Sequence, residues 1–220
     1  MKREIITTGD GSVTIYLPEM QENYHSKFGA IQEANHVFIQ NGLALTQGRP
    51  ISILEIGFGT GLNAFITYLE SLKTNQQINY TGVEAYPVTP EEVVQLNYPI
   101  QLGAANEQTT FDRMHNEDWE QKITLGTTFT LEKRKQFFQD INDVDTYDLI
   151  YFDAFGYPYQ PDLWSVEIFN KMFSALKKDG ILVTYACRTV IKKAMIEAGF
   201  STEKIPGPPG KREMLRAYKY

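Results

Sequence analysis

The stretch that decides the fold is Ile51-Ser-Ile-Leu-Glu-Ile-Gly-Phe-Gly-Thr-Gly-Leu-Asn63. The apolar run at 51–56 has the composition of a strand buried on both faces of a parallel sheet. Three glycines at alternate positions follow, and a helical pattern then begins at Leu62. A strand, a tight glycine turn and a helix in this order predict a crossover that holds a nucleotide-like ligand against bare backbone and a helix N-terminus.

The spacing of the glycines narrows the class of ligand. A dinucleotide-binding turn reads G-x-G-x-x-G, whereas this chain reads E-x-G-x-G-x-G, with Glu55 inside the strand end. This tighter form resembles the first motif of class I S-adenosylmethionine-dependent methyltransferases. A nicotinamide-dependent oxidoreductase is therefore the weaker alternative, and a glycine-rich turn without a ligand is a further one.

The rest of the chain alternates between strand and helix patterns. Five such units predict a parallel sheet with helices on both faces, and a closing antiparallel pair gives an α/β fold with a seven-stranded, mostly parallel sheet. Residues 97–126 give no clear pattern. The expected strands are 51–56, 79–84, 127–133, 147–153, 180–185, 200–205 and 214–220, and the expected helices are 61–72, a short one from 89, 161–176 and 190–198.

The first 48 residues precede this nucleotide-binding core. Residues 3–8 and 12–17 alternate around a Gly-Asp-Gly-Ser turn and predict a β-hairpin, and 30–43 predict a helix. We expect one domain over 1–220, with 1–48 as an N-terminal extension and 49–220 as the core.

Composition limits the setting in which the chain works. No apolar run approaches about 18 residues, so no transmembrane helix is expected. The start of the chain is polar rather than signal-like, and its one cysteine, Cys187, allows no intrachain disulfide. The three histidines have no metal-ligand spacing. We therefore expect a cytoplasmic protein without a membrane partner or a metal.

The net charge of −6 hides an uneven distribution. Residues 171–220 contain 11 Lys and Arg against 4 Asp and Glu, so the C-terminal quarter is basic and the remainder acidic. Such asymmetry is typical of a local contact with a polyanion. Ordinary solvated lysines on surface helices are the alternative explanation.

Acids fall at the ends of the expected strands, where ligands bind in such sheets. Glu84 follows the second strand and suits both hydroxyls of a ribose. Asp153 begins a loop, 153–164, that contains four aromatic residues and two prolines and would cover a methyl donor and form a slot for a planar base. Trp164 is expected mainly to pack on the next helix.

Taken together, the motifs resemble the methyltransferase domain of the MnmC family, which completes 5-methylaminomethyluridine at the wobble position of certain tRNAs. The resemblance covers nearly the whole chain. The residues that carry it are Tyr24, Ser26, Gly29, Glu33, Val37, Phe38, the run Glu55–Asn63, Asp153, Phe155, Pro161, Asp162, Trp164, Lys192, Lys193, Ala198, Gly199, Phe200, Gly207 and the run Gly210–Met214.

The resemblance implies N-methylation of the 5-aminomethyl group of that uridine, with S-adenosylmethionine as cofactor and the tRNA anticodon loop as partner. Asp153 would be the catalytic group or a cofactor ligand. The other expected cofactor-binding residues are Glu55, Gly57, Phe58, Gly59, Gly61, Asn63 and Glu84. The base slot would use Tyr24, Phe155 and Tyr157, and the tRNA phosphates would meet Arg188, Lys192, Lys211 and Arg212.

Some positions depart from the family pattern. Tyr157, Tyr159 and Gln160 replace proline, lysine and asparagine, and Arg134-Lys135 replaces a Gly-Asp pair expected near adenine, so the adenine contact stays unassigned. The chain ends at Tyr220, and we expect no flavin-dependent oxidoreductase domain, so that a separate enzyme makes the aminomethyl group. A methyltransferase for a small molecule or a protein, and a non-catalytic nucleic-acid-binding module, remain alternatives.

Overall fold

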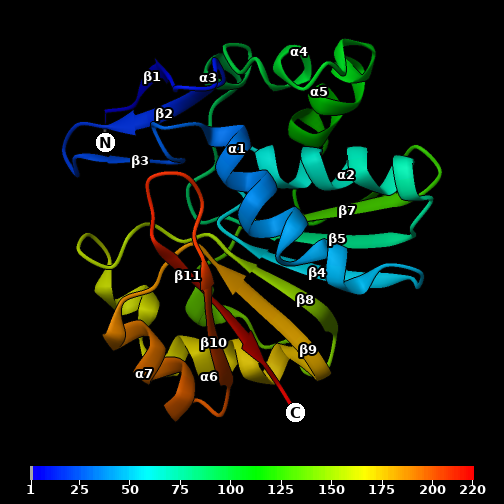
Figure 1. The fold of residues 1–220 in the computed structure, drawn as a ribbon. Coiled ribbons are helices and arrows are strands. Elements are labelled where there is room, and N and C mark those ends of the chain that lie inside the picture. Colours follow the sequence, from blue (N-terminus) through cyan, green and yellow to red (C-terminus); the bar gives the residue numbers. More distant parts are fainter. Residues whose placement is uncertain (1) are drawn as a thin grey trace.

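An eight-stranded sheet forms the centre of the computed structural model, which describes residues 2–220 (Figure 1). Met1 lies outside the described residues. The strand order is β10-β11-β9-β8-β4-β5-β7-β6. The strands are β4 (Ile51–Ile56), β5 (Ile78–Val83), β6 (Lys122–Leu125), β7 (Phe129–Arg134), β8 (Tyr147–Phe152), β9 (Leu176–Thr184), β10 (Ser201–Pro206) and β11 (Glu213–Tyr218).

The predicted mostly parallel sheet is confirmed. Strands β7, β5, β4, β8 and β9 run parallel, while β11 is antiparallel to both of its neighbours. The eighth strand, β6, is an addition to the seven expected ones and pairs antiparallel with β7 at the sheet edge. It lies in the stretch 97–126 that gave no pattern, because it is four residues long and half of its side chains are exposed.

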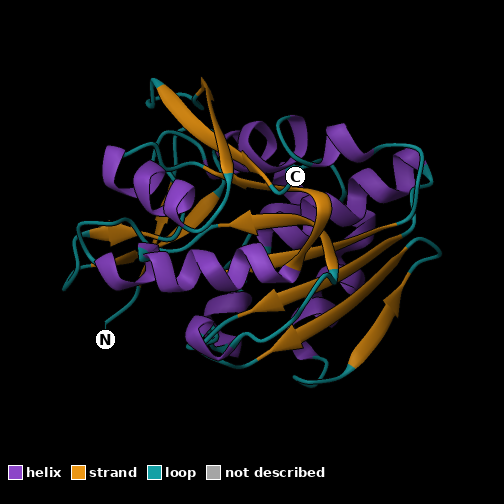
Figure 2. Cartoon of the chain, turned by 90° about the horizontal axis from the view of Figure 1, so that it is seen from below, coloured by secondary structure: helices purple, strands orange, loops and turns teal. Residues whose placement is uncertain are grey.

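Helices cover both faces of the sheet, as the views in Figures 1 and 2 show. Alternate side chains of each strand feed two separate apolar clusters, one beneath α2 and α5 and the other beneath α6 and α7. The helical segments of the core are α2 (Leu62–Thr74), α3 (Pro90–Val93), α4 (Tyr98–Gln101), η3 (Ala105–Glu107), α5 (Gln108–Asn116), η4 (Phe138–Asp140), η5 (Pro161–Trp164), α6 (Val166–Ala175) and α7 (Thr189–Glu197).

The glycine turn between β4 and α2 is fixed by its neighbours. The backbone N–H groups of Gly57 and Phe58 both donate to the carbonyl of Val83, at 3.0 Å each, so the turn is tied to the end of β5. Gly57 has a φ of 89°, and a Cβ there would stand 2.7 Å from the carbonyl oxygen of Asp153. The turn therefore requires glycine, because it must pass directly beside the end of β8.

The first 48 residues form an N-terminal layer, with a small sheet near the carboxyl ends of the core strands and a helical segment packed on the face of the sheet that α2 covers. The predicted hairpin is confirmed as β1 (Glu4–Thr7) and β2 (Val13–Leu17), with a short third strand, β3 (Glu22–Asn23). The predicted helix is α1 (Ala30–Ala34), continued as a π-helix, η1 (Asn35–Gln40), and followed by η2 (Leu43–Thr46). An ion pair between Glu33 and Lys211 joins this layer to the β10–β11 turn.

None of the helices within residues 2–220 has the length and apolar character that a membrane crossing requires.

Candidate active site

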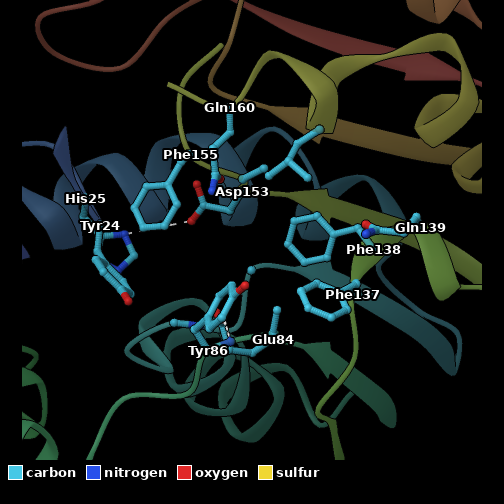
Figure 3. Close-up of a pocket in the computed structure, with 15 residues that line it drawn as sticks. Tyr24, His25, Glu84, Tyr86, Phe137, Phe138, Gln139, Asp153, Phe155 and Gln160 are labelled. Carbon is cyan, nitrogen blue, oxygen red and sulfur yellow. Dashed lines mark hydrogen bonds and ion pairs between the residues drawn. The ribbon is translucent and has the colours of Figure 1, made fainter. Parts of the chain in front are cut away.

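A cavity of about 200 Å³ opens where β4, β5 and β8 end (Figure 3). Its walls come from the glycine turn, the loops after β5, β7 and β8, and the N-terminal layer. In Figure 3, Asp153 lies between His25 and Phe138, with Glu84 across the cavity from it. The position is the one at which parallel α/β sheets bind their ligands.

The charge of the cavity wall is one-sided. Two of the lining side chains are carboxylates, Glu84 and Asp153, and none of the lining residues is Lys or Arg. A wall of this kind disfavours phosphates and favours a ligand with positive charge. This lining therefore counts against a dinucleotide, whose pyrophosphate would meet two acids without a cationic partner.

Glu84 faces the glycine turn from the end of β5. One carboxylate oxygen accepts a hydrogen bond from the Gly59 N–H at 3.0 Å, and the other accepts from the Tyr86 N–H at 2.9 Å. These two bonds orient the carboxylate at the cavity wall and leave lone pairs on both oxygens. Paired hydroxyl groups, such as those of a ribose, suit such an acceptor.

Asp153 is buried and bonded from below. Asn63, in the first turn of α2, donates its side-chain N–H groups to Oδ2 of Asp153 at 2.8 Å and to Oε1 of Glu55 at 2.9 Å. Burial, together with the charge of Glu33, raises the pKa of Asp153 to about 7, against the opposing effects of the hydrogen bond from Asn63 and the charge of Lys211. A carboxyl group with this pKa exchanges its proton near neutral pH, as a general base must.

Glu55 lies beneath the cavity rather than in its wall. It is 1% exposed, and burial raises the pKa of its carboxyl well above the ordinary value. Its Oε2 and the Oδ1 of Asn63 are buried without a hydrogen-bond partner among the described residues. Glu55 therefore holds Asn63, which in turn holds Asp153, and contact of Glu55 with a ligand is indirect.

His25 was missed as a site residue by the sequence analysis, which noted only that the histidines have no metal-ligand spacing. The Tyr98 hydroxyl donates to Oγ1 of Thr60 at 3.0 Å, and Oγ1 lies 2.9 Å from Nε2 of His25. The other ring nitrogen of His25, Nδ1, is the one nearer to Asp153. That nitrogen is 3.9 Å from Oδ2 of Asp153.

His25 is neutral at physiological pH, because burial lowers its pKa to about 4. It therefore faces Asp153 as a neutral ring rather than as a cation. His25 and Asn63 both face Oδ2, and Oδ1 of Asp153 has no hydrogen bond within the part of the chain that the structure describes. The free oxygen is the one available to a bound reactant.

Two of the three expected base-slot residues come together. The rings of Tyr24 and Phe155 meet edge to face with their centres 5.1 Å apart, beside Asp153. The buried indole of Trp164 donates to the carbonyl of Phe155 at 2.8 Å and so holds the loop, in line with its expected packing role. The third residue, Tyr157, lies elsewhere, in a second hollow on the other side of the loop.

The far end of the cavity supplies a contact that the sequence left unassigned. Phe137, Phe138 and Gln139, from the segment after β7, line the wall next to Glu84. Phe137 is about half exposed and meets the ring of Tyr86 with a centre-to-centre distance of 5.9 Å. These rings offer flat apolar faces to a planar group such as adenine. The preceding residues, Arg134 and Lys135, gave no signal of this kind.

Two residues of the glycine motif, Phe58 and Gly61, lie outside the cavity and shape the turn. Phe58 is 3% exposed and packs where Gly82 has no side chain, against the rings of His115 and Trp119. Gly61, with a φ of 70°, begins α2 without any side-chain cap. Neither lines the cavity, so both shape the turn rather than touch a ligand in it.

The four basic residues predicted to meet phosphate lie outside the cavity. Arg188, Lys211 and Arg212 line the second hollow together with Tyr157, and Lys192 lies on α7 close by in the chain. Lys211 is paired with Glu33, and its ammonium group also lies 3.9 Å from the centre of the Tyr185 ring. The positive charge of Lys211 is therefore partly neutralised within the protein.

Comparison with known proteins shows the family to which the chain belongs. A family model described as S-adenosyl-L-methionine-dependent methyltransferase matches residues 107–220. The chain is 29% identical, over 92% of its length, to the tRNA 5-methylaminomethyl-2-thiouridine biosynthesis bifunctional protein MnmC of Burkholderia vietnamiensis. It is 30% identical, over 88% of its length, to the protein of that name from Aromatoleum aromaticum. It spans about a third of the length of these relatives.

Solved structures agree on the fold. The crystal structure of MNMC2 from Aquifex aeolicus superposes with a TM-score of 0.79 at 21% identity, over 98% of this chain and 69% of that one. Spermidine synthase from Thermotoga maritima superposes with a TM-score of 0.55 at 13% identity, over 99% of this chain and 68% of that one. Since the family model covers more than half of the residues, the chain belongs to the S-adenosyl-L-methionine-dependent methyltransferases.

Proposed function

We propose that this chain transfers a methyl group from S-adenosylmethionine to the primary amine of a 5-aminomethyluridine at the wobble position of a tRNA. The observation that carries the proposal is the free carboxylate oxygen of Asp153 beside the Tyr24–Phe155 ring pair. It is supported by the relatives that are named for tRNA 5-methylaminomethyl-2-thiouridine biosynthesis.

The cavity residues fit the cofactor that the family uses. Glu84 would accept from the ribose hydroxyls, and Phe137 and Phe138 would pack on adenine. The one-sided acidic wall suits the positive charges of the sulfonium and the amino group. When bound, the cofactor supplies a methyl group on a positively charged sulfur, which is already a good leaving group. The protein's task is then mostly positioning and the exclusion of water.

Asp153 would take up the proton that the acceptor amine loses, or hold that amine by a hydrogen bond. An alkylamine resembles a lysine side chain, with a pKa of about 10.4 in water, and it must lose a proton before its nitrogen can attack. Oδ1 of Asp153 would accept that proton or hold the amine through a hydrogen bond. Positive charge grows on the nitrogen as the methyl group is transferred, and a carboxylate at this place stabilises it.

The other expected contacts complete the proposal. Tyr24 and Phe155 would hold the flipped-out uracil ring, since single-stranded bases are recognised by stacking on aromatic side chains. Arg188, Lys192 and Arg212 would contact anticodon phosphates. The aminomethyl group would be supplied by a separate oxidoreductase, and both steps would take place in the cytoplasm, where the tRNA is modified.

Methyl transfer to tRNA tests the proposal directly. Purified protein, S-adenosylmethionine with a labelled methyl group, and tRNA from a strain deleted for this gene are combined, and the tRNA nucleosides are separated by mass spectrometry. We expect 5-aminomethyluridine in the deletion-strain tRNA to be converted to its N-methyl form. Failure to label that tRNA, combined with labelling of the free nucleoside or of a protein, would support the alternative of a non-tRNA substrate.

A further inference from the structure

A second hollow, of about 520 Å³, lies directly beside the proposed methyl-transfer cavity. The two share the loop after β8: Phe155 lines the first, and Tyr157, two residues on, lines the second. The Tyr185 hydroxyl from the second hollow donates to the carbonyl of Ala154 in the first at 2.9 Å. Gly156 separates the two aromatic residues in the loop, and the Glu22 carboxylate lies close to it, 3.1 Å from where a Cβ would stand.

The walls of the second hollow suit a flat ring. Tyr157 and Tyr185 supply aromatic faces, and the buried Ile191 supplies an apolar contact. The guanidinium carbon of Arg188 lies 6.0 Å from the centre of the Tyr157 ring. An aromatic face with an arginine beside it is the combination on which nucleobases stack.

The charge of the second hollow is opposite to that of the first. Arg188 and Arg212 are exposed and form no ion pair within residues 2–220. Of the two acids in the wall, Glu213 is paired with Lys204 at 2.8 Å, which leaves Glu22 alone against the two arginines. The uncompensated charge is therefore positive, which suits a phosphate.

We infer that this hollow holds the nucleotide next to the acceptor uridine, with its base against Tyr157 and its phosphate at Arg188 and Arg212. Because the inference needs an RNA chain that continues beyond the acceptor, it rests on the proposed function. Under it, the loop after β8 reads two consecutive nucleotides, one on each side. A free nucleoside lacks the second contact and binds more weakly than the same nucleoside within RNA.

Short RNA hairpins test the inference. Each carries 5-aminomethyluridine in its loop, and the base of its 5′ neighbour, of its 3′ neighbour, or of a nucleotide three positions away is removed while the backbone is kept. We expect loss of one neighbouring base to raise the KM of the wild-type protein about tenfold, the order of one base–aromatic stack, with little change in kcat. Loss of the distant base should change neither constant.

Variants of the aromatic residues supply the controls. Tyr157→Ala should raise the KM for the intact hairpin about tenfold. Removal of the neighbouring base should then raise the KM of this variant no further, because the variant already lacks the stacking interaction that the base would make. Tyr157→Phe keeps the ring and should keep the dependence on the base. Tyr159→Ala, in the same loop but outside both hollows, should behave as wild type.

Two outcomes would overturn the inference separately. If the wild-type protein does not methylate the intact hairpin or whole tRNA, the proposed function fails and the inference fails with it. If the intact hairpin is methylated but neither neighbouring base affects the KM, or if Tyr157→Ala and base removal act additively, the proposed function stands and the second hollow is not a nucleotide site.

Discussion

Asp153 is a carboxylate that folding places in a buried position between Asn63 and His25, and burial raises its pKa to about 7. In the unfolded chain the same group ionises near pH 4. Between these values the folded protein holds a proton that the unfolded chain releases, so the stability contributed by Asp153 falls as the pH rises from about 4 to 7. Above pH 7 the folded state carries the full cost of a buried charge.

Asp153→Asn should therefore separate stability from activity. At pH 8 it removes the buried charge, so we expect the free energy of unfolding to rise by roughly 1–4 kcal/mol, the upper figure corresponding to the whole pKa shift. Methyl transfer should fall by about 10²–10⁴, the usual contribution of a general base. Denaturant unfolding at pH 5 and pH 8 measures the first effect and single-turnover assays the second. Lower stability at pH 8, or unchanged transfer, would contradict this role.

His25 should act through Asp153 rather than on the reactants. Its Nδ1 lies 3.9 Å from Oδ2 of the carboxylate, and the tautomer that carries the proton on Nδ1 would lower the pKa of Asp153. We expect His25→Leu to move the acidic limb of the kcat profile to higher pH and to lower kcat about tenfold, or ~1.4 kcal/mol. His25→Gln, which keeps an N–H donor, should recover part of the loss.

The matched control for His25 is His36, which bonds the carbonyl of Pro206 away from the cavity. His36→Leu should leave the pH profile in place. A profile that shifts equally in both variants would mean that His25 supports only the general packing of the N-terminal layer.

At the scale of elements, the β4–α2 turn and the loop after β8 form one unit. Gly57 lies against the backbone of Asp153, so the position of the glycine turn fixes the position of the proposed base. A displacement of one segment displaces the other. The strands β4 and β8 are far apart in the sequence but are neighbours in the sheet, and this contact joins their carboxyl ends into one site.

Gly57→Ala should disrupt that unit. Positive φ costs a non-glycine residue roughly 1–2 kcal/mol, and the Cβ at 2.7 Å from a backbone oxygen adds a clash that no rotamer relieves. Gly103 is the control, because its φ of 65° is similar but a Cβ there meets nothing within 4 Å. We expect Gly103→Ala to cost about 1 kcal/mol, and Gly57→Ala to cost more and to abolish S-adenosylmethionine binding in calorimetry. If the two variants lost the same free energy of unfolding, the backbone at Asp153 would be shown to move aside for the added Cβ at little cost.

At the scale of the whole molecule, charge is divided between two neighbouring surfaces. The cavity wall is acidic, and the second hollow is basic although the chain as a whole is negative. The proposed substrate needs both, since its amine carries positive charge and its backbone negative charge. The basic residues that the sequence concentrates in its C-terminal quarter thus lie in part around the second hollow.

Salt should reveal the basic surface. Arg212→Gln removes one exposed, unpaired cation, so we expect weaker tRNA binding and a decrease of about one in the slope of log affinity against log salt concentration. Lys178→Gln is the control, because that residue is exposed near the amino end of β9, opposite the ligand-binding edge. Filter binding from 50 to 300 mM salt measures both. Equal slopes for wild type and Arg212→Gln would place the RNA backbone elsewhere.

Most of the fold could be predicted from local sequence patterns. The strand at 51–56 and its glycine turn were predicted at their observed positions, because an apolar run followed by glycines depends on neighbours in the chain alone. The cavity was only partly predictable. Glu84 and Asp153 follow strands and could be placed, whereas His25 and Phe137 reach the cavity through tertiary packing of segments with no distinctive pattern. Tyr157 was grouped with Phe155 because spacing in a loop does not reveal on which side each ring lies.

The acidic wall around the donor also bears on turnover. Transfer removes the positive charge from the sulfur, so the spent donor, S-adenosylhomocysteine, carries one positive charge fewer beside the wall that contains Glu84 and Asp153. We expect it to bind more weakly than the fresh donor, which would limit product inhibition. Competition calorimetry with wild type and Asp153→Asn would measure this, and the variant should hold the two molecules with more similar affinities. The same two carboxylates would thus load the enzyme before the reaction and help to empty it afterwards.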